Sequence, residues 1–257
     1  MELLKHQTVA PVFKGVFFDF DGTLVDSEPL HFQAEKAALN SRGIFFDLTD
    51  KKDLIGGTVK GTAERICAKY GIQDVDSFFI ERESVFHKLV DSTLAFIPGA
   101  QSLIEILAHK GVLIALVTSG TPNYVLTFLN KHQITKKFQS IVTMADVELH
   151  KPYPDPYIKA LELTSLNSNE SIAIEDSPNG VISAQKAKIP CIYIDDGDTE
   201  LASESDSILR VKTLKSVDVS ASCVGAAPAQ KHSEDAQTSQ VEIRGFPPQK
   251  SRRNAWF

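Results

Sequence analysis

The chain has 257 residues, 42% hydrophobic and 23% charged, so it can bury a sizeable core, and wholesale disorder is excluded. Its 27 Lys and Arg against 33 Asp and Glu give a net charge of −6, without the basic excess of a dedicated nucleic-acid-binding protein. No apolar run approaches the roughly 20 residues that a membrane span needs.

Short β-rich segments alternate with helical segments along most of the chain. Phe13–Asp19 is apolar, rich in Val and Phe and too short for a helix, which predicts a buried strand. Further strands are predicted at Val112–Thr118, Gln139–Thr143, Ser171–Glu175 and Pro190–Asp195. Helical spacing of apolar residues predicts helices over Gly99–Lys110, Tyr124–His132, Pro156–Thr164 and Pro178–Lys188. This alternation predicts an α/β fold with a doubly wound parallel sheet.

Residues Glu28–Asp91 interrupt that alternation. They contain no convincing strand, but amphipathic stretches at His31–Ser41, Thr58–Tyr70 and Asp76–Val90. An all-helical insert of about 65 residues is too large for a loop or a crossover. We therefore predict a small inserted all-helical cap domain at residues 26–95, hinged near Val25–Pro29 and Ala95–Gly99, and a core formed by residues 12–25 and 96–215.

The end of the chain changes in composition from about Ser216. This part is rich in Ser, Ala and Gln and poor in large apolar residues. We predict that residues 216–257 form a disordered C-terminal tail. The alternative is a docking peptide that ends in Trp256 and Phe257.

Acidic, hydroxyl and basic residues follow the predicted strands. Because the carboxyl ends of parallel strands meet at one edge of a sheet, these side chains should gather there. Each alone has a plainer explanation as a turn residue, a helix cap or a surface charge. In chain order they are Asp19, Asp21, Thr118, Ser119, Lys151, Glu175 and Asp176.

Crowded carboxylates raise one another's pKa unless a cation neutralises them, and hard oxygen ligands suit Mg²⁺ best. Backbone amides around Ser119 and Gly120, with Lys151, predict an anion site at a helix N-terminus. A metal, an anion site and a carboxylate nucleophile indicate phosphoryl transfer through an aspartyl-phosphate. Asp19 and Asp21 are two residues apart in extended chain and point to the same side, so one can attack while the other moves the proton.

Four segments resemble, in order and separation, the motifs of the haloacid dehalogenase-like hydrolase superfamily: DFDGT (Asp19–Thr23), LVTSG (Leu116–Gly120), HKPYPDPY (His150–Tyr157) and IEDSPNG (Ile174–Gly180). The resemblance covers about Phe13–Thr213. The helical insert is similar to that of the subgroup with a small helical cap, which includes β-phosphoglucomutase-like enzymes and many sugar-phosphate phosphatases. The resemblance implies a Rossmann-like core with a four-helix cap that closes over the substrate.

The resemblance also implies roles for individual residues. Asp19 would be the nucleophile and Asp21 the general acid and then base. The magnesium ligands would be Asp19, the backbone carbonyl of Asp21, and Asp176, with Glu175 as a weaker candidate. Thr118 and the amide of Ser119 would bind the phosphoryl group, and Lys151 would offset the charge on Asp19 and the phosphate.

Cap residues that face the site should select the substrate, and the candidates are Glu28, His31, Lys60 and Arg65. His31 could equally be an ordinary histidine on a helix face, and Lys60 and Arg65 ordinary solvated charges. We expect a Mg²⁺-dependent phosphatase that hydrolyses a small phosphate ester, a hexose or pentose phosphate.

Two alternatives remain open at this point. One is a β-phosphoglucomutase-like mutase, although Thr23 is usual in phosphatases where such mutases tend to have Val. The other is a catalytically inactive binding module.

The three cysteines, Cys67, Cys191 and Cys223, offer neither a disulfide framework nor metal-type spacing. The N-terminus lacks the features of a secretory signal. We therefore expect a cytoplasmic monomer with no nucleic-acid or membrane partner.

Overall fold

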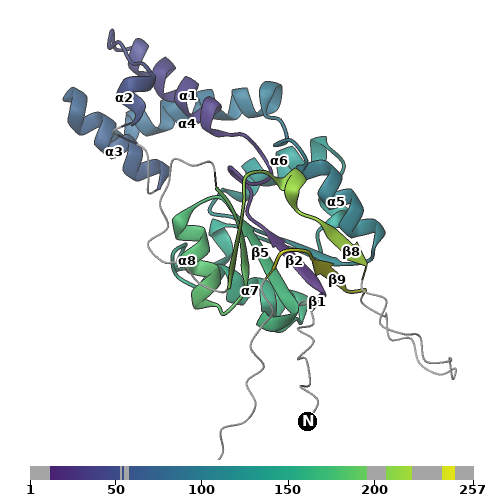
Figure 1. Cartoon of the computed structure of the whole chain (residues 1–257). Helices are drawn as coiled ribbons and strands as arrows, with labels where there is room; N and C mark the ends of the chain where they lie inside the picture. The colour runs from purple at the N-terminus through teal and green to yellow at the C-terminus, as the bar shows by residue number, and fades with distance from the viewer. Residues whose placement is uncertain (1–11, 53, 55–57, 196–206, 222–238, 247–257) are drawn as a thin grey trace, which may run out of the picture.

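The computed structural model describes residues 12–52, 54, 58–195, 207–221 and 239–246. Within them, six parallel strands form a sheet in the order β4-β3-β2-β5-β6-β7 (Figure 1). The strands are β2 Gly15–Phe18, β3 Leu113–Val117, β4 Ser140–Val142, β5 Ser171–Glu175, β6 Cys191–Ile194 and β7 Ile208–Val211. The chain builds the sheet outward from β2 in one direction and then from β5 in the other, so a crevice is expected beyond the carboxyl ends of β2 and β5.

Helices cover both faces of this sheet, and alternate strand residues point to the two layers. Val16 and Phe18 of β2 belong to a core cluster with α5 (Ala100–His109) and α6 (Pro122–Lys131). Phe17, between them in the sequence, packs on the other face with α7 (Asp155–Thr164) and α8 (Pro178–Lys186). The predicted doubly wound α/β core is confirmed, and it buries β2 and β5 on both sides.

Four further helices form the cap: α1 Glu28–Asn40, α2 Leu48–Lys52, α3 Val59–Tyr70 and α4 Val75–Thr93. They enclose their own apolar cluster, which includes Phe46, Ile66 and Phe78. The two linkers to the core lie side by side, because Val25 bridges to Phe96. The C-terminal half of α4 packs on the core instead, with Phe86 and Val90 in the same cluster as β2.

A second, three-stranded sheet corrects the prediction for the end of the chain. It has the order β1-β9-β8, formed by β1 Val12–Phe13, β8 Val219–Ala221 and β9 Val241–Ile243. Val241 and Ile243 are buried, and the ring of Phe246 meets that of Phe13 edge-on at 5.9 Å. A disordered tail is therefore wrong for residues 216–221 and 239–246. The stretch is polar on average, so the sequence pattern did not reveal its few apolar residues that pack against β1 and the core.

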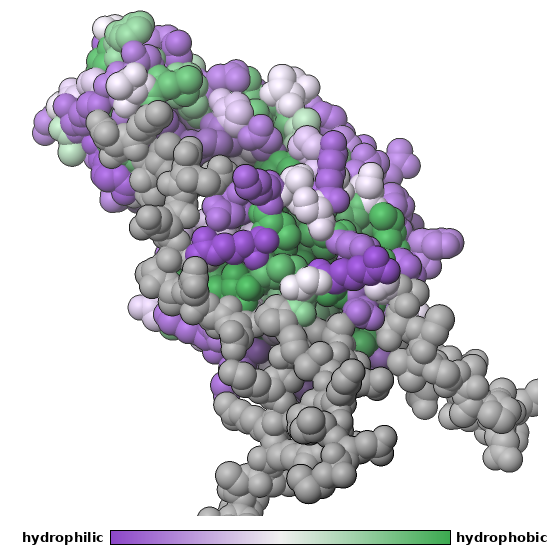
Figure 2. Space-filling model, in the orientation of Figure 1, coloured by the Kyte–Doolittle hydropathy of each residue, from purple (hydrophilic) through white to green (hydrophobic). Residues whose placement is uncertain are grey.

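Residues 222–238 and 247–257, with Trp256 and Phe257, lie outside the described residues. Figure 2 shows apolar side chains at the surface of the core around the small sheet and at the tip of the cap. Phe45, shortly before α2, and Leu48, its first residue, are exposed. In the described part of the chain, no helix combines the length and hydropathy that crossing a membrane requires.

Short 3-10 helices also occur in the described part of the chain: η1 Thr135–Lys137, η2 Met144–Asp146, η3 Ser168–Glu170 and η4 Leu214–Ser216.

Candidate active site

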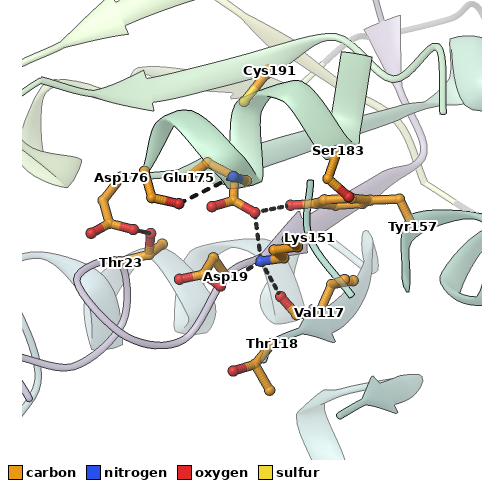
Figure 3. A network of polar contacts seen from close by, with 12 residues as sticks. Asp19, Thr23, Val117, Thr118, Lys151, Tyr157, Glu175, Asp176, Ser183 and Cys191 are labelled. Atoms are coloured by element: carbon orange, nitrogen blue, oxygen red, sulfur yellow. Dashed lines mark hydrogen bonds and ion pairs between the residues drawn. The ribbon is translucent and has the colours of Figure 1, made fainter. Parts of the chain in front are cut away.

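The acidic residues gather at the carboxyl ends of β2 and β5. Asp19 follows β2, Glu175 is the last residue of β5, and Asp176 comes next. One carboxylate oxygen from each lies within 4.8 Å of one from each of the others. Thr118, which follows β3, and Lys151, from the loop before α7, lie at the same edge (Figure 3).

Lys151 is the centre of a buried hydrogen-bond network. Its Nζ donates to Oδ1 of Asp19 at 2.5 Å, Oε1 of Glu175 at 2.6 Å and the carbonyl of Val117 at 2.8 Å (Figure 3). Tyr157 donates its hydroxyl to the same Oε1 of Glu175 at 2.5 Å. Burial disfavours the ammonium charge, but the two carboxylates outweigh burial and raise the pKa of Lys151 above its usual value. Lys151 is therefore a permanent cation between two acids.

One lysine does not neutralise the three carboxylates. Burial raises the pKa of Asp19, and burial with the charges of Asp19 and Glu175 raises the pKa of Asp176 to about 8. Burial also raises the pKa of Glu175 to about 7, against the opposing effect of Lys151. Hard oxygens that retain protons near neutral pH fit a divalent cation, which would replace those protons. The donor set therefore fits such an ion between Asp19 and Asp176.

Glycine at position 22 allows Asp176 to approach β2. Gly22 has φ of +75°, and a Cβ there would lie 1.8 Å from Oδ2 of Asp176. Thr23, the next residue, is buried and its Oγ1 lies 3.5 Å from Oδ1 of Asp176. The DFDGT segment thus supplies Asp19 and turns at Gly22, where any side chain would collide with Asp176. Its last residue, Thr23, contacts Asp176 directly.

Asp21 lies beside this cluster and is half-buried. Its Oδ1 accepts hydrogen bonds from Ser27 Oγ at 2.6 Å and Tyr124 Oη at 2.7 Å. Burial raises the pKa of Asp21 to about 6, although both hydrogen bonds oppose the rise. A carboxyl group with this pKa can both donate and accept a proton near neutral pH.

The predicted phosphate-binding residues flank the acids. Thr118 is buried, and its Oγ1 accepts a hydrogen bond from the backbone N–H of Gly120 at 2.9 Å. Ser119 is exposed between them, just before α6 begins at Pro122. A hydroxyl and the start of a helix thus lie at the same edge of the sheet as Asp19, an arrangement that suits an anion.

The four cap candidates differ in their surroundings. His31 is half-buried, its ring stacks on Phe86 at 4.2 Å, and its Nδ1 contacts the guanidinium of Arg82. Burial, Arg82 and Lys51 lower the pKa of His31 well below its usual value, so the ring is neutral. His31 thus lies in the aromatic contact between the cap and α6, because Phe86 also meets Tyr124 at 5.2 Å.

The other candidates make contacts within the cap. Glu28 is exposed on α1 and lies 3.3 Å from Lys51 Nζ. Lys60 is exposed and pairs with Asp76 at 3.5 Å. Arg65 donates to the carbonyl of Leu54 at 2.8 Å and to Thr62. Among the contacts of the described residues, those of His31 lead through Phe86 and Tyr124 to Asp21, whereas those of Lys60 and Arg65 do not.

Several residues around the site have no counterpart among the sequence predictions. Ser27 and Tyr124 bind Asp21, and Tyr157 binds Glu175. In the cap, Lys51 donates to both carboxylate oxygens of Glu35 at 2.8 and 2.7 Å, and both side chains are buried. Tyr157 stands within the HKPYPDPY segment and could have been suspected. Ser27, which precedes α1, and the helix residues Tyr124, Lys51 and Glu35 show no distinguishing pattern.

Comparisons with known proteins agree with this geometry. The model of the haloacid dehalogenase-like hydrolase family matches residues 16–194. A validoxylamine A 7'-phosphate phosphatase of Streptomyces hygroscopicus subsp. limoneus is 27% identical over 201 residues, 77% of this chain and 94% of the relative. A phosphorylated carbohydrates phosphatase of Thermotoga maritima is 28% identical over 185 residues, 70% and 84% of the two chains.

Solved structures of the same kind share the fold. The crystal structure of a HAD hydrolase, family IA, variant 3 from Entamoeba histolytica superposes with a TM-score of 0.69 at 26% identity. The superposition covers 80% of this chain and 96% of the other.

Proposed function

The chain belongs to the haloacid dehalogenase-like hydrolase family, and from this premise we propose that it is a phosphatase that hydrolyses a small phosphate ester through an aspartyl-phosphate on Asp19. One observation carries the proposal: carboxylates from β2 and β5 converge within 4.8 Å at the sheet edge that also holds Lys151. The two named relatives are phosphatases, which supports the same reaction class.

In the first step, a carboxylate oxygen of Asp19 attacks phosphorus, and the bond between phosphorus and the alcohol oxygen breaks. Asp21 gives its proton to the departing alcohol oxygen. Lys151 stabilises the anionic site, while Thr118 and the amide of Ser119 hold the phosphoryl oxygens. The buried ammonium of Lys151 also fixes the orientation of Asp19, because it binds Oδ1 at 2.5 Å.

In the second step, water attacks the aspartyl-phosphate, and Asp21 takes a proton from that water. The phosphorus–oxygen bond to Asp19 breaks, inorganic phosphate leaves, and both carboxyl groups return to their starting states. A pKa of about 6 for Asp21 suits this double use as acid and base.

We propose Mg²⁺ as the cofactor, held by Asp19, Asp176 and the backbone carbonyl of Asp21. When bound, it would neutralise the carboxylates and the phosphoryl oxygens during transfer. Glu175 is less suited as a direct ligand, since its Oε1 already accepts hydrogen bonds from Lys151 and Tyr157. Its role would be to keep Lys151 beside Asp19.

A phosphorylated sugar is the proposed substrate class. One of the two bacterial relatives is named a phosphorylated carbohydrates phosphatase, and the other a phosphatase of validoxylamine A 7'-phosphate. His31, half-buried in the cap, stacks on Phe86, which meets Tyr124 beside Asp21. A polar ring at this place suits the hydroxyls of a hexose or pentose phosphate.

The test is turnover of p-nitrophenyl phosphate and of a panel of hexose, pentose and polyol phosphates, with Mg²⁺ and with excess chelator. We expect activity that the chelator abolishes and that Asp19→Asn lowers by at least about 10⁴-fold, because the nucleophile is lost. Asp91→Asn, the same change at an exposed position at the end of α4, should retain full activity.

Three other outcomes would contradict the proposal. Turnover that persists in Asp19→Asn excludes the aspartyl-phosphate. Isomerisation of a sugar 1-phosphate primed with a bisphosphate, without net phosphate release, identifies a mutase. An absence of turnover on every ester favours a binding module.

A further inference from the structure

The carboxyl group of Asp21 is held by one of its two oxygens. Ser27 Oγ and Tyr124 Oη both donate to Oδ1, at 2.6 and 2.7 Å. An oxygen that accepts two hydrogen bonds is a poor place for a proton, so the transferable proton belongs on Oδ2. The pair of hydroxyls thus determines which oxygen of Asp21 can act as the acid.

Of the two donors, Tyr124 is the more distant in the chain, 103 residues from Asp21 and on helix α6. Its side chain is buried, with 4% of its surface exposed. A tyrosine hydroxyl keeps its proton at neutral pH, and here it donates that hydrogen to Oδ1 of Asp21. A donor that cannot ionise in the working pH range gives Oδ1 a constant partner.

The ring of Tyr124 is fixed by two aromatic neighbours. Phe20, between Asp19 and Asp21, meets it at 5.3 Å and 77°, and Phe86 from cap helix α4 meets it at 5.2 Å and 63°. Edge-to-face pairs of this geometry restrain a ring in both position and tilt. The hydroxyl is therefore placed by the core on one side and by the cap on the other.

We propose that Tyr124 is a positioning residue for the proton transfer: its hydroxyl binds Oδ1 of Asp21 and directs Oδ2 toward the leaving oxygen of the substrate. This inference rests on the proposed function, because it requires Asp21 to act as an acid. As the phosphorus–oxygen bond breaks, its electron pair goes to the leaving oxygen, and the proton on Oδ2 goes to that same oxygen. Without the Tyr124 hydroxyl, the carboxyl group can rotate away from this geometry.

A purely structural role for Tyr124 makes a different prediction, which the leaving group can separate. p-Nitrophenolate is a stable anion and needs little protonation as it departs, whereas an alkoxide needs a full proton. If Asp21 is no longer positioned as an acid, kcat/KM should therefore fall for alkyl phosphates and change little for the aryl phosphate. A general loss of packing lowers turnover of both kinds of ester together.

The experiment measures kcat/KM of Tyr124→Phe on p-nitrophenyl phosphate and on glycerol 2-phosphate or a sugar phosphate. This constant reports the steps up to the first irreversible one, here transfer to Asp19, whatever limits kcat. We expect a fall of about 10- to 100-fold on the alkyl ester and less than about 3-fold on the aryl ester. Ser27→Ala, which removes the other donor to Oδ1, should show the same split.

Tyr70→Phe is the matched control, because Tyr70 packs against Phe46 within the cap and has no contact with Asp21 among the described contacts. It should change neither constant. Equal losses on both esters, no loss, or a gain on the alkyl ester in Tyr124→Phe overturn the proposal while leaving the proposed phosphatase intact. Failure of the wild-type protein to hydrolyse either ester overturns both.

Discussion

The ammonium group of Lys151 lies 2.5 Å from Oδ1 of Asp19, although 132 residues separate them in the chain. The same group binds Oε1 of Glu175 and the carbonyl of Val117, so one cation joins the ends of β2, β3 and β5. Removing a partner from such a group leaves the remaining charges buried and uncompensated.

Lys151→Met should therefore lower both activity and stability. With no cation beside Asp19, we expect kcat/KM to fall by about 10²- to 10³-fold, the usual cost of losing a preorganised electrostatic contact. Lys151→Arg should recover little, because a planar guanidinium does not replace a point charge among three acceptors. Lys186→Met, at an exposed lysine on α8 that binds the carbonyl of Pro152, is the control. Near-normal activity in Lys151→Met would contradict the assigned role.

Gly180→Ala should be destabilising although it lies in helix α8. Alanine in place of glycine in a helix normally stabilises by up to about 1 kcal/mol. Here the new Cβ would lie 1.8 Å from Oε2 of Glu175, whose carboxylate Lys151 and Tyr157 hold in place. We expect a net loss of about 1–3 kcal/mol in the free energy of unfolding, the usual cost of overpacking, together with reduced activity.

Denaturant unfolding and steady-state kinetics of Gly180→Ala measure both effects. Asn179→Ala, at the exposed neighbouring position of the same helix, controls for the altered helix propensity. Were Gly180→Ala more stable than the wild type, the close packing of Glu175 on α8 would be wrong.

Ile243→Ala tests whether strand β9 is part of the core. Ile243 is 1% exposed and belongs to the same apolar cluster as Val16 and Phe18. Truncating a buried isoleucine costs about 2–5 kcal/mol. We therefore expect a clear fall in the unfolding free energy, with activity per folded molecule unchanged.

Arg244→Ala is the control on the exposed neighbouring residue, whose ion pair with Asp218 is exposed and contributes little. An Ile243→Ala protein as stable as the wild type would show that β9 is not held on the core in solution.

His31 should make the stability of the protein depend on pH. Burial and the charges of Arg82 and Lys51 lower its pKa in the folded state, so the native protein keeps the ring neutral. As the pH falls through about 6.5, the unfolded chain binds a proton that the native state does not. This titration by itself should lower the unfolding free energy as the pH falls, by up to about 1.4 kcal/mol for each pH unit, whereas the raised pKa values of Asp21, Glu175 and Asp176 act in the opposite direction.

His31→Gln removes this titration, so the unfolding free energy of His31→Gln minus that of the wild type should increase between pH 7 and pH 5.5. Gln33→Ala, at an exposed position of the same helix, should keep the wild-type slope. The measurement is denaturant unfolding at a series of pH values. Parallel curves for the wild type and His31→Gln would contradict a buried neutral ring.

The parts of the fold that follow from the sequence are those with a strong local pattern. Long amphipathic helices and buried strands such as Ser171–Glu175 have periodicities that a single segment displays. Helix α2 has only five residues, and the edge strand β7 is only partly buried, so neither shows a clear apolar pattern. Such elements depend on the surfaces that they pack against.

The place of the acids in the site follows from the sequence, because Asp19, Asp21 and Asp176 come after, and Glu175 ends, strands whose carboxyl ends meet in a parallel sheet. The folded structure was needed to show that Tyr124 binds Asp21, that Lys51 pairs with Glu35, and that β9 pairs with β1. Hydrogen bonds and packing of this kind depend on how separate elements are rotated and spaced against one another. A periodicity shows which face of a helix is buried, but not which side chain of another element it meets there.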